Sequence, residues 1–349
     1  MSARVLPAEE PSAIDEAAAV LRRGGLVAFP TETVYGLGAD AFNPRAVARV
    51  FEVKARPSFD PLIVHLADAA DLARVSPTDD PRVHALAARF WPGPLTLVLS
   101  RRPEVPDLVT SGLNTVGVRV PAHPAARALI VASGTPVAAP SANPFGYVSP
   151  TTAAHVAELL GPSVDLVLDG GPCRVGVEST ILSLASGTPT ILRPGGVPRE
   201  ALEEALGVPL EVARRARRPL APGPLEKHYA TRTPLRILPG PAGRAPEGAG
   251  RVGLLAWRAA PDGGYAATGV LAPDGSPETA AASLFAALRR LDAAGLDLIL
   301  AEPCDEAGLG HAIMDRLRRA AGPATAGASG RAPRRSSPGA RPRRRREGT

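Results

Sequence analysis

The segment GLVAFPTETVYGLG spans residues 25–38 and joins a short apolar run to a dense polar loop. The run at 25–29 is apolar and aromatic, and it predicts a buried strand. The polar residues that follow it are Thr31, Glu32, Thr33 and Tyr35. Gly36 and Gly38 would let backbone approach a ligand, and ligands of α/β proteins lie at strand ends of this kind. A glycine-rich turn with a capping threonine would have the same composition, so both interpretations stay open here.

On either side of this segment, strand and helix signals alternate as far as residue 208. Further strands are expected at 62–66, 95–99, 116–120, 135–139, 165–168, 179–184 and 189–193. Helices are expected at 12–23, 44–54, 81–90, 123–132 and 151–160, and Asn43-Pro44 is a helix start signal. The alternation predicts an α/β fold with a sheet of about seven strands of mixed direction.

The pattern changes after residue 208, and it divides the chain into four parts. Residues 1–208 form the first α/β domain, and the Pro- and Arg-rich residues 209–234 are interpreted as a linker. A smaller α/β domain is predicted at 235–321, and residues 322–349 form an Arg-rich tail expected to be disordered. The expected strands of the smaller domain are 235–238, 251–257 and 296–302, and its expected helices are 277–294 and 309–320.

The charge of the chain is concentrated in its tail. Residues 331–349 hold eight arginines against Glu347, a net +7, which leaves −1 for the rest of a chain whose total is +6. The isoelectric point near 10 therefore belongs to the tail and not to the folded body. The tail is either solvated and dispensable or a weak, salt-sensitive tether for RNA.

Several classes of protein are disfavoured by the sequence. No run approaches the roughly 20 apolar residues of a membrane helix, and residues 1–20 lack the layout of a signal peptide. Cys173 and Cys304 lie far apart and match no zinc spacing. The cytoplasm is therefore the expected location. There is no GxxxxGK[ST] loop and no GxGxxG, so a nucleotide would have to be held in another way.

Three more segments combine strand ends with unusual polar residues. In KARPSFDPLIVH (54–65), Lys54 and Arg56 lie at the C-terminus of a helix, where cations that cap the helix would look the same. Alternation along 62–66 places Ile63 and His65 on one face and Leu62, Val64 and Leu66 on the other. A histidine in such a place is more often structural than a ligand.

The remaining two segments are APSANPFG (139–146) and GVEST…TILRPGG (176–196). The first offers Ser141 and Asn143 on one side of an extended segment, although an ordinary polar loop would look alike. In the second, Ser179 opens a strand and Arg193 ends the next one, and an arginine at a glycine-rich strand end suits phosphate.

Taken in this order, the segments resemble the YrdC-like threonylcarbamoyl-AMP synthase family in its long, two-domain form. The resemblance rests first on the K-x-R…S-x-N signature, which is formed here by Lys54, Arg56, Ser141 and Asn143. Other shared motifs are PTETVYGLG (30–38), WPGPLT (91–96), VRVPAHP (118–124), GVEST (176–180), LRPG (192–195), KHYA (227–230), LILAEP (298–303) and GLGHAIMDRLRRA (308–320). The resemblance implies a YrdC-like twisted mixed sheet with flanking helices and a smaller Rossmann-like C-terminal domain.

By this resemblance, the protein makes threonylcarbamoyl-AMP from L-threonine, bicarbonate (or CO₂) and ATP and releases pyrophosphate. A downstream threonylcarbamoyl-transfer enzyme then uses the product to modify tRNA. The implied threonine-binding residues are Thr33, His65, Arg119 and Ser179; the implied ATP-binding residues are Arg56, Asp60, Thr115, Ala139, Ser141, Asn143, Arg193 and Tyr229. Lys54 and Arg56 are the expected catalytic residues. Mg²⁺ is expected to arrive with ATP, with no metal site of the protein's own.

Two positions depart from the family pattern, and two other functions compete with the synthase. Asp60 stands where the family usually has Asn, and Thr231 stands where a Pro usually follows HYA. Both departures concern ATP affinity. A carboxylate at Asp60 would repel the ATP phosphates unless it contacts the ribose, the base or the metal. Thr231 follows the linker residues Lys227, His228 and Tyr229, which could fold over the site as a lid. One rival is a non-catalytic RNA-binding protein, which the nearly neutral body disfavours. The other is the carbamoyl-transfer module of hydrogenase-maturation proteins, whose zinc-finger and acylphosphatase segments do not occur here.

Overall fold

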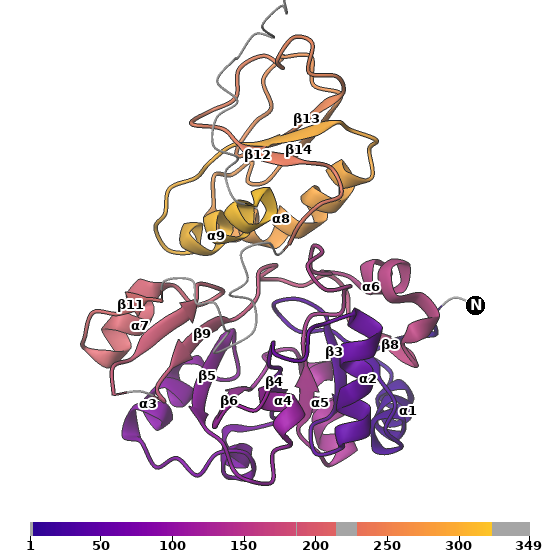
Figure 1. The fold of residues 1–349 in the computed structure, drawn as a ribbon, viewed down its shortest axis with the longest axis vertical. Coiled ribbons are helices and arrows are strands. Elements are labelled where there is room, and N and C mark those ends of the chain that lie inside the picture. The colour runs from indigo at the N-terminus through magenta and orange to yellow at the C-terminus, as the bar shows by residue number, and fades with distance from the viewer. Residues whose placement is uncertain (1–2, 186, 214–228, 323–349) are drawn as a thin grey trace, which may run out of the picture.

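The computed structural model describes residues 3–185, 187–213 and 229–322, which form two α/β units (Figure 1). Lys227, His228 and the Arg-rich tail lie outside these residues, and so does most of the predicted linker. Within the described ranges, no helix is long and apolar enough to cross a membrane.

The larger unit is built on an eleven-stranded sheet with the order β1-β8-β2-β3-β7-β4-β6-β5-β9-β10-β11. Its strands are β1 (Val5–Pro7), β2 (Val27–Phe29), β3 (Gly36–Asp40), β4 (Ile63–His65), β5 (Leu95–Ser100), β6 (Thr115–Arg119), β7 (Val137–Ala139), β8 (Leu166–Asp169), β9 (Thr180–Ser183), β10 (Thr190–Arg193) and β11 (Glu211–Val212). β2 runs parallel to β8 and antiparallel to β3, so the predicted mixed sheet is confirmed. The prediction of about seven strands was too low, because β1, β3 and β11 gave no strand signal. β11 also extends the large sheet beyond residue 208.

The helices of the larger unit are α1 (Pro11–Arg22), α2 (Pro44–Lys54), α3 (Pro81–Phe90), α4 (Asp107–Thr110), α5 (Pro124–Ser133), α6 (Ala153–Leu160) and α7 (Arg199–Leu206), with short 3₁₀ turns at Ala69–Arg74 and Gly161–Ser163. Four of them, α1, α2, α3 and α5, have proline in the first turn, where the missing N–H costs nothing. The Asn43 side chain caps α2 by accepting from the N–H groups of Arg45 and Ala46, at 3.1 and 3.2 Å.

The glycines of PTETVYGLG are required by strand packing. Both Gly36 and Gly38 lie in β3 and not in a turn, which corrects the loop expected there. A Cβ atom on Gly36 would lie 3.1 Å from the Phe29 ring. A Cβ on Gly38 would lie 2.8 Å from that ring and 2.7 Å from Val137. The ring of Phe29 on β2 therefore lies against β3, where it leaves no room for a side chain at Gly38 and little room at Gly36.

The smaller unit is a parallel four-stranded sheet with the order β12-β15-β13-β14. Its elements are β12 (Leu235–Ile237), β13 (Val252–Ala256), β14 (Ala267–Val270), α8 (Pro277–Asp292), β15 (Leu298–Ala301) and α9 (Gly310–Ala321). Figure 1 shows that α8 and α9 lie on the side of this sheet that faces the larger unit. β14 was not predicted, because its sequence ATGV is short and only one of its residues is buried.

The two units share a hydrophobic cluster. Val34, Val148 and Val177 of the larger unit pack with apolar residues of α8 and α9, among them Phe285 and Ile313. Gly176 has a φ of +73°, and a Cβ there would lie 2.3 Å from the Ala281 carbonyl oxygen of α8. The smaller unit is thus fitted closely onto loops that follow the strands of the large sheet.

Candidate active site

A cavity of about 560 Å³, including its open mouth, lies where these loops meet. Its volume is typical of small-molecule sites. It is lined by Thr31, Thr33, Val34, Gly36, Arg56, Ile63, His65, Arg119, Ala139, Pro140, Ser141, Glu178, Ser179, Arg193 and Tyr229. Nine of the thirteen residues predicted from sequence are in this set. The other four, Lys54, Asp60, Thr115 and Asn143, are not among the described residues that line the cavity.

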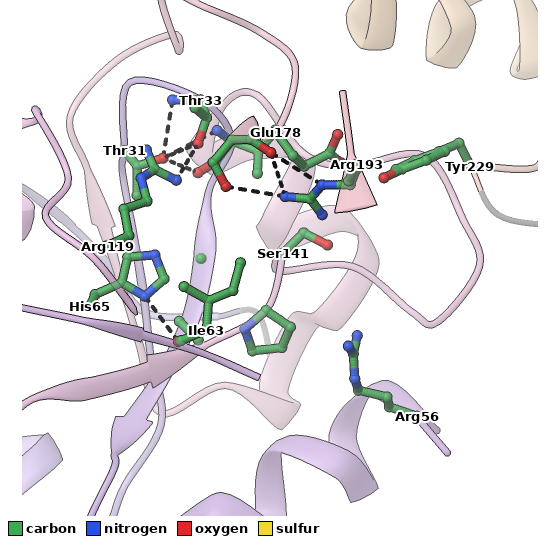
Figure 2. A pocket seen from close by; sticks show the side chains of 15 residues that line it. Thr31, Thr33, Arg56, Ile63, His65, Arg119, Ser141, Glu178, Arg193 and Tyr229 are labelled. Atoms are coloured by element: carbon green, nitrogen blue, oxygen red, sulfur yellow. Dashed lines mark hydrogen bonds between the residues drawn. The ribbon is translucent and has the colours of Figure 1, made fainter. Parts of the chain in front are cut away.

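The cavity has two ends. Figure 2 shows Thr31, Thr33, His65 and Arg119 together on one side, which we call the Arg119 end. Arg56, Arg193 and Tyr229 lie on the other side, which we call the Arg193 end, and Ser141 lies between the two. A ligand that spans the cavity would therefore meet arginines at both ends.

A tight turn shapes the Arg119 end. The Thr31 hydroxyl donates to the Val34 carbonyl oxygen at 2.6 Å, and it accepts from the backbone N–H groups of Thr33 and Val34. The hydroxyls of Thr31 and Thr33 lie 2.9 Å apart. This local network turns the chain directly after β2 and points the Thr33 hydroxyl toward Arg119 (Figure 2).

Arg119 ends β6 and is held on three sides. Its Nη2 lies 2.6 Å from Oε1 of Glu32, and both side chains are buried. Its Nη1 donates to the Thr33 hydroxyl at 3.0 Å, and its Nε donates to the Gly93 carbonyl oxygen at 3.1 Å. Glu32 also accepts from the N–H of Ala122 at 3.0 Å. Because the guanidinium group has five N–H donors, two remain for a ligand, one on each Nη atom.

His65 lies beside Arg119, on the face predicted by the alternation of 62–66. It lines the cavity together with Ile63, whereas Leu62, Val64 and Leu66 belong to the main core. Burial, followed by the charge of Arg119, lowers the pKa of His65 to about 3. The neutral ring lies with Nδ1 3.2 Å from the carbonyl oxygen of Ile63. The imidazole is therefore an uncharged partner for a ligand at neutral pH.

At the other end, Arg56 leaves the C-terminus of α2 and turns back on its own loop. Its Nε and Nη2 each donate at 2.9 Å, to the carbonyl oxygens of Asp60 and Pro61. Its Nη2 also lies 2.9 Å from the Asp60 carboxylate, and both side chains are buried. The guanidinium group lies over the ring of Phe145, 5.8 Å from the ring centre. Asp60 is thus placed behind Arg56, and Arg56 faces the cavity.

Lys54 holds the loop that carries Ser141. It is 1% exposed, and its Nζ donates to the carbonyl oxygen of Ser141 at 2.5 Å and to that of Asn143. Burial lowers its pKa well below the usual value, and the charge of Arg56 adds to this effect. Asn143 is also buried, and its Nδ2 donates to the carbonyl oxygens of Pro144 and Tyr147, at 3.0 and 2.8 Å. Both residues act on the path of the backbone beneath the cavity.

Ser179 and Arg193 are joined directly. Arg193 ends β10, and its Nη2 donates to the Ser179 carbonyl oxygen at 2.9 Å and lies 3.2 Å from the Ser179 hydroxyl. The same hydroxyl lies 2.8 Å from that of Thr96. A Cβ atom at Gly195 would lie 2.3 Å from the Ser179 carbonyl carbon, so only glycine lets the LRPG segment lie against GVEST.

Two site residues come with contacts from the smaller unit. Tyr229, with a φ of +63°, is fully buried and stacks on Phe285 of α8 at 5.5 Å between ring centres. Glu178 accepts from the Ser149 hydroxyl at 2.6 Å and from Nε of Arg316 on α9 at 2.8 Å. Burial alone would raise the pKa of Glu178, but the charges of Arg316 and Arg193 outweigh it and lower the pKa to about 2. Glu178 is therefore a carboxylate at any pH in which the protein would work.

The remaining predicted residue, Thr115, begins β6 and pairs with Ser100 of β5. Sequence reasoning named Glu32 as one of the polar residues after the strand at 25–29, but it did not single out Glu178 or Arg316. For Arg316 a signal did exist, because a charged residue on an apolar helix face needs a partner of opposite charge. Arg316 lies three residues after Ile313 and one before Leu317, on the buried face of α9.

The chain is similar to known proteins over almost all of its described length. A family model described as "Telomere recombination" matches residues 19–195, and one described as "Threonylcarbamoyl-AMP synthase, C-terminal domain" matches residues 197–322. The threonylcarbamoyl-AMP synthase of Pyrococcus abyssi is 43% identical over 321 residues, which cover 88% of this chain and 93% of that protein. That of Bacillus subtilis is 45% identical over 323 residues, with the same coverage of both chains. The crystal structure of P. abyssi Sua5 complexed with L-threonine matches with a TM-score of 0.86 at 40% identity, over 92% of this chain and 98% of that chain.

Proposed function

The chain belongs to the threonylcarbamoyl-AMP synthase family in its two-domain form, and we propose that it catalyses the reaction that gives the family its name. It joins L-threonine, bicarbonate and ATP into threonylcarbamoyl-AMP and releases pyrophosphate. The threonine amine and bicarbonate first give a carbamate with loss of water. A carbamate oxygen then attacks the α-phosphorus of ATP, and the bond from that phosphorus to the bridging oxygen of pyrophosphate breaks.

One observation carries this proposal: residues suited to bind threonine and residues suited to bind phosphate converge on one cavity from four separate segments of the chain. Thr33, His65 and Arg119 lie at one end, and Arg56 and Arg193 lie at the other. The two ends suit the two substrates, because each presents arginines to an anion. The bound L-threonine of the P. abyssi structure supports threonine as a substrate of this chain as well.

At the Arg119 end, we propose that the threonine carboxylate binds the two N–H groups that Arg119 has left. The contacts to Glu32, Thr33 and Gly93 fix the plane of the guanidinium group before the substrate arrives. A planar group fixed in this way can bind a carboxylate through two parallel hydrogen bonds. His65 and Ser179 would hold the rest of the amino acid.

At the Arg193 end, we propose that Arg193 and Arg56 neutralise the phosphates of ATP, and that Ser141, Ala139 and Tyr229 contribute to its binding. The reaction needs no covalent nucleophile of the protein, so its rate depends on positioning and on charge stabilisation. Arg56 keeps its role as a proposed catalytic residue. Lys54 acts through the loop of Ser141 and Asn143, as a positioning residue. Thr115 remains a proposed ATP-binding residue for which this cavity offers no contact.

Asp60 and Mg²⁺ would both affect the balance of charge around ATP. The buried carboxylates nearest the cavity, Glu32, Asp60 and Glu178, each face an arginine and so make poor metal ligands. We propose that Mg²⁺ enters on the phosphates of ATP, as is usual for this ion. Asp60 would act on ATP only through the orientation of Arg56.

The proposed setting follows from the product, an activated threonylcarbamoyl group that reacts with water. A downstream threonylcarbamoyl-transfer enzyme would consume it in tRNA modification, and the cytoplasm is the proposed location. The Arg-rich tail would add at most a weak contact to tRNA. The relatives named as synthases favour this function over that of a non-catalytic RNA-binding protein.

The experiment that tests the proposal is an assay of pyrophosphate release from ATP. Purified protein is supplied with bicarbonate and Mg²⁺, with and without L-threonine, and L-serine serves as the control amino acid. Release that requires both threonine and bicarbonate, together with a product of the mass of threonylcarbamoyl-AMP, would establish the synthase. Folded protein that releases no pyrophosphate under any of these conditions would refute it.

A further inference from the structure

The ion pair between Glu178 and Arg316 joins the two units at the wall of the cavity. Glu178 belongs to the GVEST segment and lines the cavity, whereas Arg316 lies on α9 and is fully buried. Nε of Arg316 donates to Glu178 at 2.8 Å, and its Nη1 donates to Asp315 at 2.7 Å. The guanidinium group of Arg316 also lies over the ring of Tyr229, 5.1 Å from the ring centre. The smaller unit therefore contacts two residues that line the cavity, Glu178 and Tyr229, through one side chain.

The arginines that line the cavity differ in their partners. Arg56 is paired with Asp60 at 2.9 Å, and Arg119 is paired with Glu32 at 2.6 Å. Arg193 donates only to uncharged oxygens of Ser179 in the described part of the chain, and no ion pair of it is seen there. Glu178 lies close enough to interact with Arg193 electrostatically, but its hydrogen bonds go to Ser149 and Arg316.

The charges behind the cavity wall add up to a net positive cluster. Arg193, Arg316 and Arg319 face Glu178 and Asp315, and Asp315 accepts from both Arg316 and Arg319. The cluster holds three cations and two anions, and Arg193 is the cation among them that lines the cavity. Removal of Arg316 would leave two cations and two anions, and Arg193 would become the nearest partner of Glu178.

We propose that Arg316 of the smaller unit is a positioning residue for the ATP site, which occupies Glu178 and so leaves the charge of Arg193 to the phosphates of ATP. The inference rests on the proposed function, because it names the residue that prepares the polyphosphate end of that site. It also gives the smaller unit a role in substrate binding through a side chain of the described structure. Without Arg316, a buried carboxylate would face the bound phosphates and compete with them for Arg193.

The test uses the full-length chain and four variants. Arg316→Met removes the cation, and Arg316→Met with Glu178→Gln removes both charges and restores the net charge of the cluster. Arg316→Lys keeps the charge without the planar fork. Arg318→Met is the matched control, because Arg318 lies on the same helix but is exposed and pairs with Glu306 at the surface. Circular dichroism verifies that each variant is folded.

The first readout is the dissociation constant of Mg²⁺–ATP, measured by equilibrium dialysis without threonine, so that it does not depend on turnover. An uncompensated carboxylate in the wall of the ATP site predicts ATP binding weakened by roughly ten- to a hundredfold in Arg316→Met. The double variant is expected to bind ATP within about threefold of the unchanged protein, and so is Arg318→Met. The KM for threonine should change much less than that for ATP, since Arg119 lies at the other end.

The second readout is the pH dependence of ATP affinity. A merely structural role of Arg316 would not change this dependence. The charged and titratable groups around Glu178 are Arg193, Tyr229 and, on α9, Asp315, Arg316 and Arg319. Once Arg316 is gone, burial raises the pKa of Glu178, so acid should neutralise the carboxylate more easily. The loss of ATP affinity in Arg316→Met, relative to the unchanged protein at each pH, should therefore shrink from pH 8.5 to pH 5.5. The double variant should show no such trend.

Several results would overturn the inference. These are unchanged ATP binding in folded Arg316→Met, an equal loss in Arg318→Met, or a folded double variant that binds ATP no better than Arg316→Met. If Arg316→Met does not fold, the inference is still open to refutation, because a folded double variant or Arg316→Lys that binds ATP tenfold or more weakly than the unchanged protein would overturn it. ATP binding without threonine-dependent pyrophosphate release would refute the proposed function alone. A chain that does not bind ATP at all would refute both.

Discussion

The two ends of the cavity are held in place by different parts of the molecule. At the Arg119 end, the described contacts of Glu32, Thr33, His65 and Arg119 all come from the large unit, most of them from strands and the turns between them. At the Arg193 end, Glu178 and Tyr229 depend on α8 and α9 of the smaller unit. A change at the first end should therefore act locally, whereas a change at the second should report on the contact between the units.

If the proposed sites are right, threonine binds where the contacts come from one unit, and ATP binds where both units contribute contacts. The sheet fixes the arginine proposed for threonine, and its partner Glu32 is buried with it. Under our inference, Arg193, which has no ion pair among the described residues, would pair with Glu178 if Arg316 of the smaller unit moved away. The affinity for ATP is thus the property that would respond to any change in how the units sit on each other.

The largest effect is expected from a substitution that disrupts the Arg119 end of the cavity. Arg119→Met leaves Glu32 buried without its cation, and we expect the free energy of unfolding to fall by about 3–5 kcal/mol. Threonine-dependent pyrophosphate release should be lost in the same variant. Urea denaturation at pH 7 and the pyrophosphate assay measure the two effects.

A double variant, Glu32→Gln with Arg119→Met, separates stability from function in that experiment. It should recover most of the lost stability, because no unpaired charge remains buried, but it should recover no activity. Restored turnover in the double variant would show that Arg119 serves the fold and does not bind threonine.

The next effect concerns the loop between the two ends. Lys54→Met removes the donor to the carbonyl oxygens of Ser141 and Asn143, which should cost about 2–3 kcal/mol of stability. The loop would then shift, and the KM for ATP should rise by at least about tenfold, since misplacement of a positioned group by about 1 Å is enough for such losses. The measurement is steady-state kinetics with ATP and with threonine varied separately.

Arg74→Met is a matched control for Lys54→Met. Arg74 also donates to a backbone carbonyl oxygen, that of Gly134 at 3.1 Å, but it does so at the surface and away from the cavity. Its loss should leave both KM values unchanged. A KM for threonine that rises as much as that for ATP in Lys54→Met would place Lys54 in both ends of the site.

Much of the Arg119 end was predictable from sequence because its signals are local. Alternation along 62–66 predicted which side of β4 carries His65, and the strands at the Arg119 end were anticipated except for β3. β3 was not predicted, because glycine has a low propensity for β-strands and β3 contains two glycines. The reason for its glycines, the ring of Phe29 on the neighbouring strand, exists only after the sheet has formed.

The Arg193 end could be predicted only in part, for the same physical reason. The motifs indicated Arg193, Ser179 and Tyr229, but nothing local indicates that Arg316, more than a hundred residues away, pairs with Glu178. Lys54 illustrates a second limit. The family signature indicated a catalytic role for Lys54, whereas in the structure Lys54 is buried and its Nζ donates to two backbone carbonyl groups beneath the loop.

A smaller effect is expected in the pH dependence of stability, and it concerns His65 at the Arg119 end. The folded-state pKa of His65 is about 3, below the ordinary value of 6.5, so between these values the unfolded chain binds a proton that the folded chain does not. The stability contributed by the neutral ring is therefore present above pH 6.5 and is lost as pH falls toward 3. From pH 7 to pH 5 the loss should be about 2 kcal/mol.

His65→Asn should remove this share of the acid sensitivity. The comparison is the drop in unfolding free energy from pH 7 to pH 5, measured by urea denaturation of the two proteins under the same conditions. His123 and His155 also have lowered pKa values, but they are present in both proteins and cancel in the difference. Equal drops in the two proteins would mean that the ring of His65 takes up a proton in the folded state.

The smallest effect tests the contact between the units at a point away from any charge in the cavity. Tyr147, in the segment that follows Asn143, donates its hydroxyl to Asp292 of α8 at 2.7 Å. Tyr147→Phe removes this one hydrogen bond, while Asp292 still accepts from the N–H of Thr233. We expect a stability loss of about 1 kcal/mol and, because the Asn143 amide is bonded to the Tyr147 carbonyl oxygen, a KM for ATP raised by roughly two- to fivefold.

Tyr265→Phe supplies the control, because the hydroxyl of Tyr265 donates to the Gly243 carbonyl oxygen at 3.1 Å entirely within the smaller unit. It should leave the KM for ATP unchanged even if it lowers stability by a similar amount. If both variants raise that KM equally, the ATP site responds to the general stability of the smaller unit. If Tyr147→Phe alone does so, the site responds to the contact itself, because the loss of a single hydrogen bond between the units then weakens ATP binding while the Arg119 end keeps its affinity for threonine.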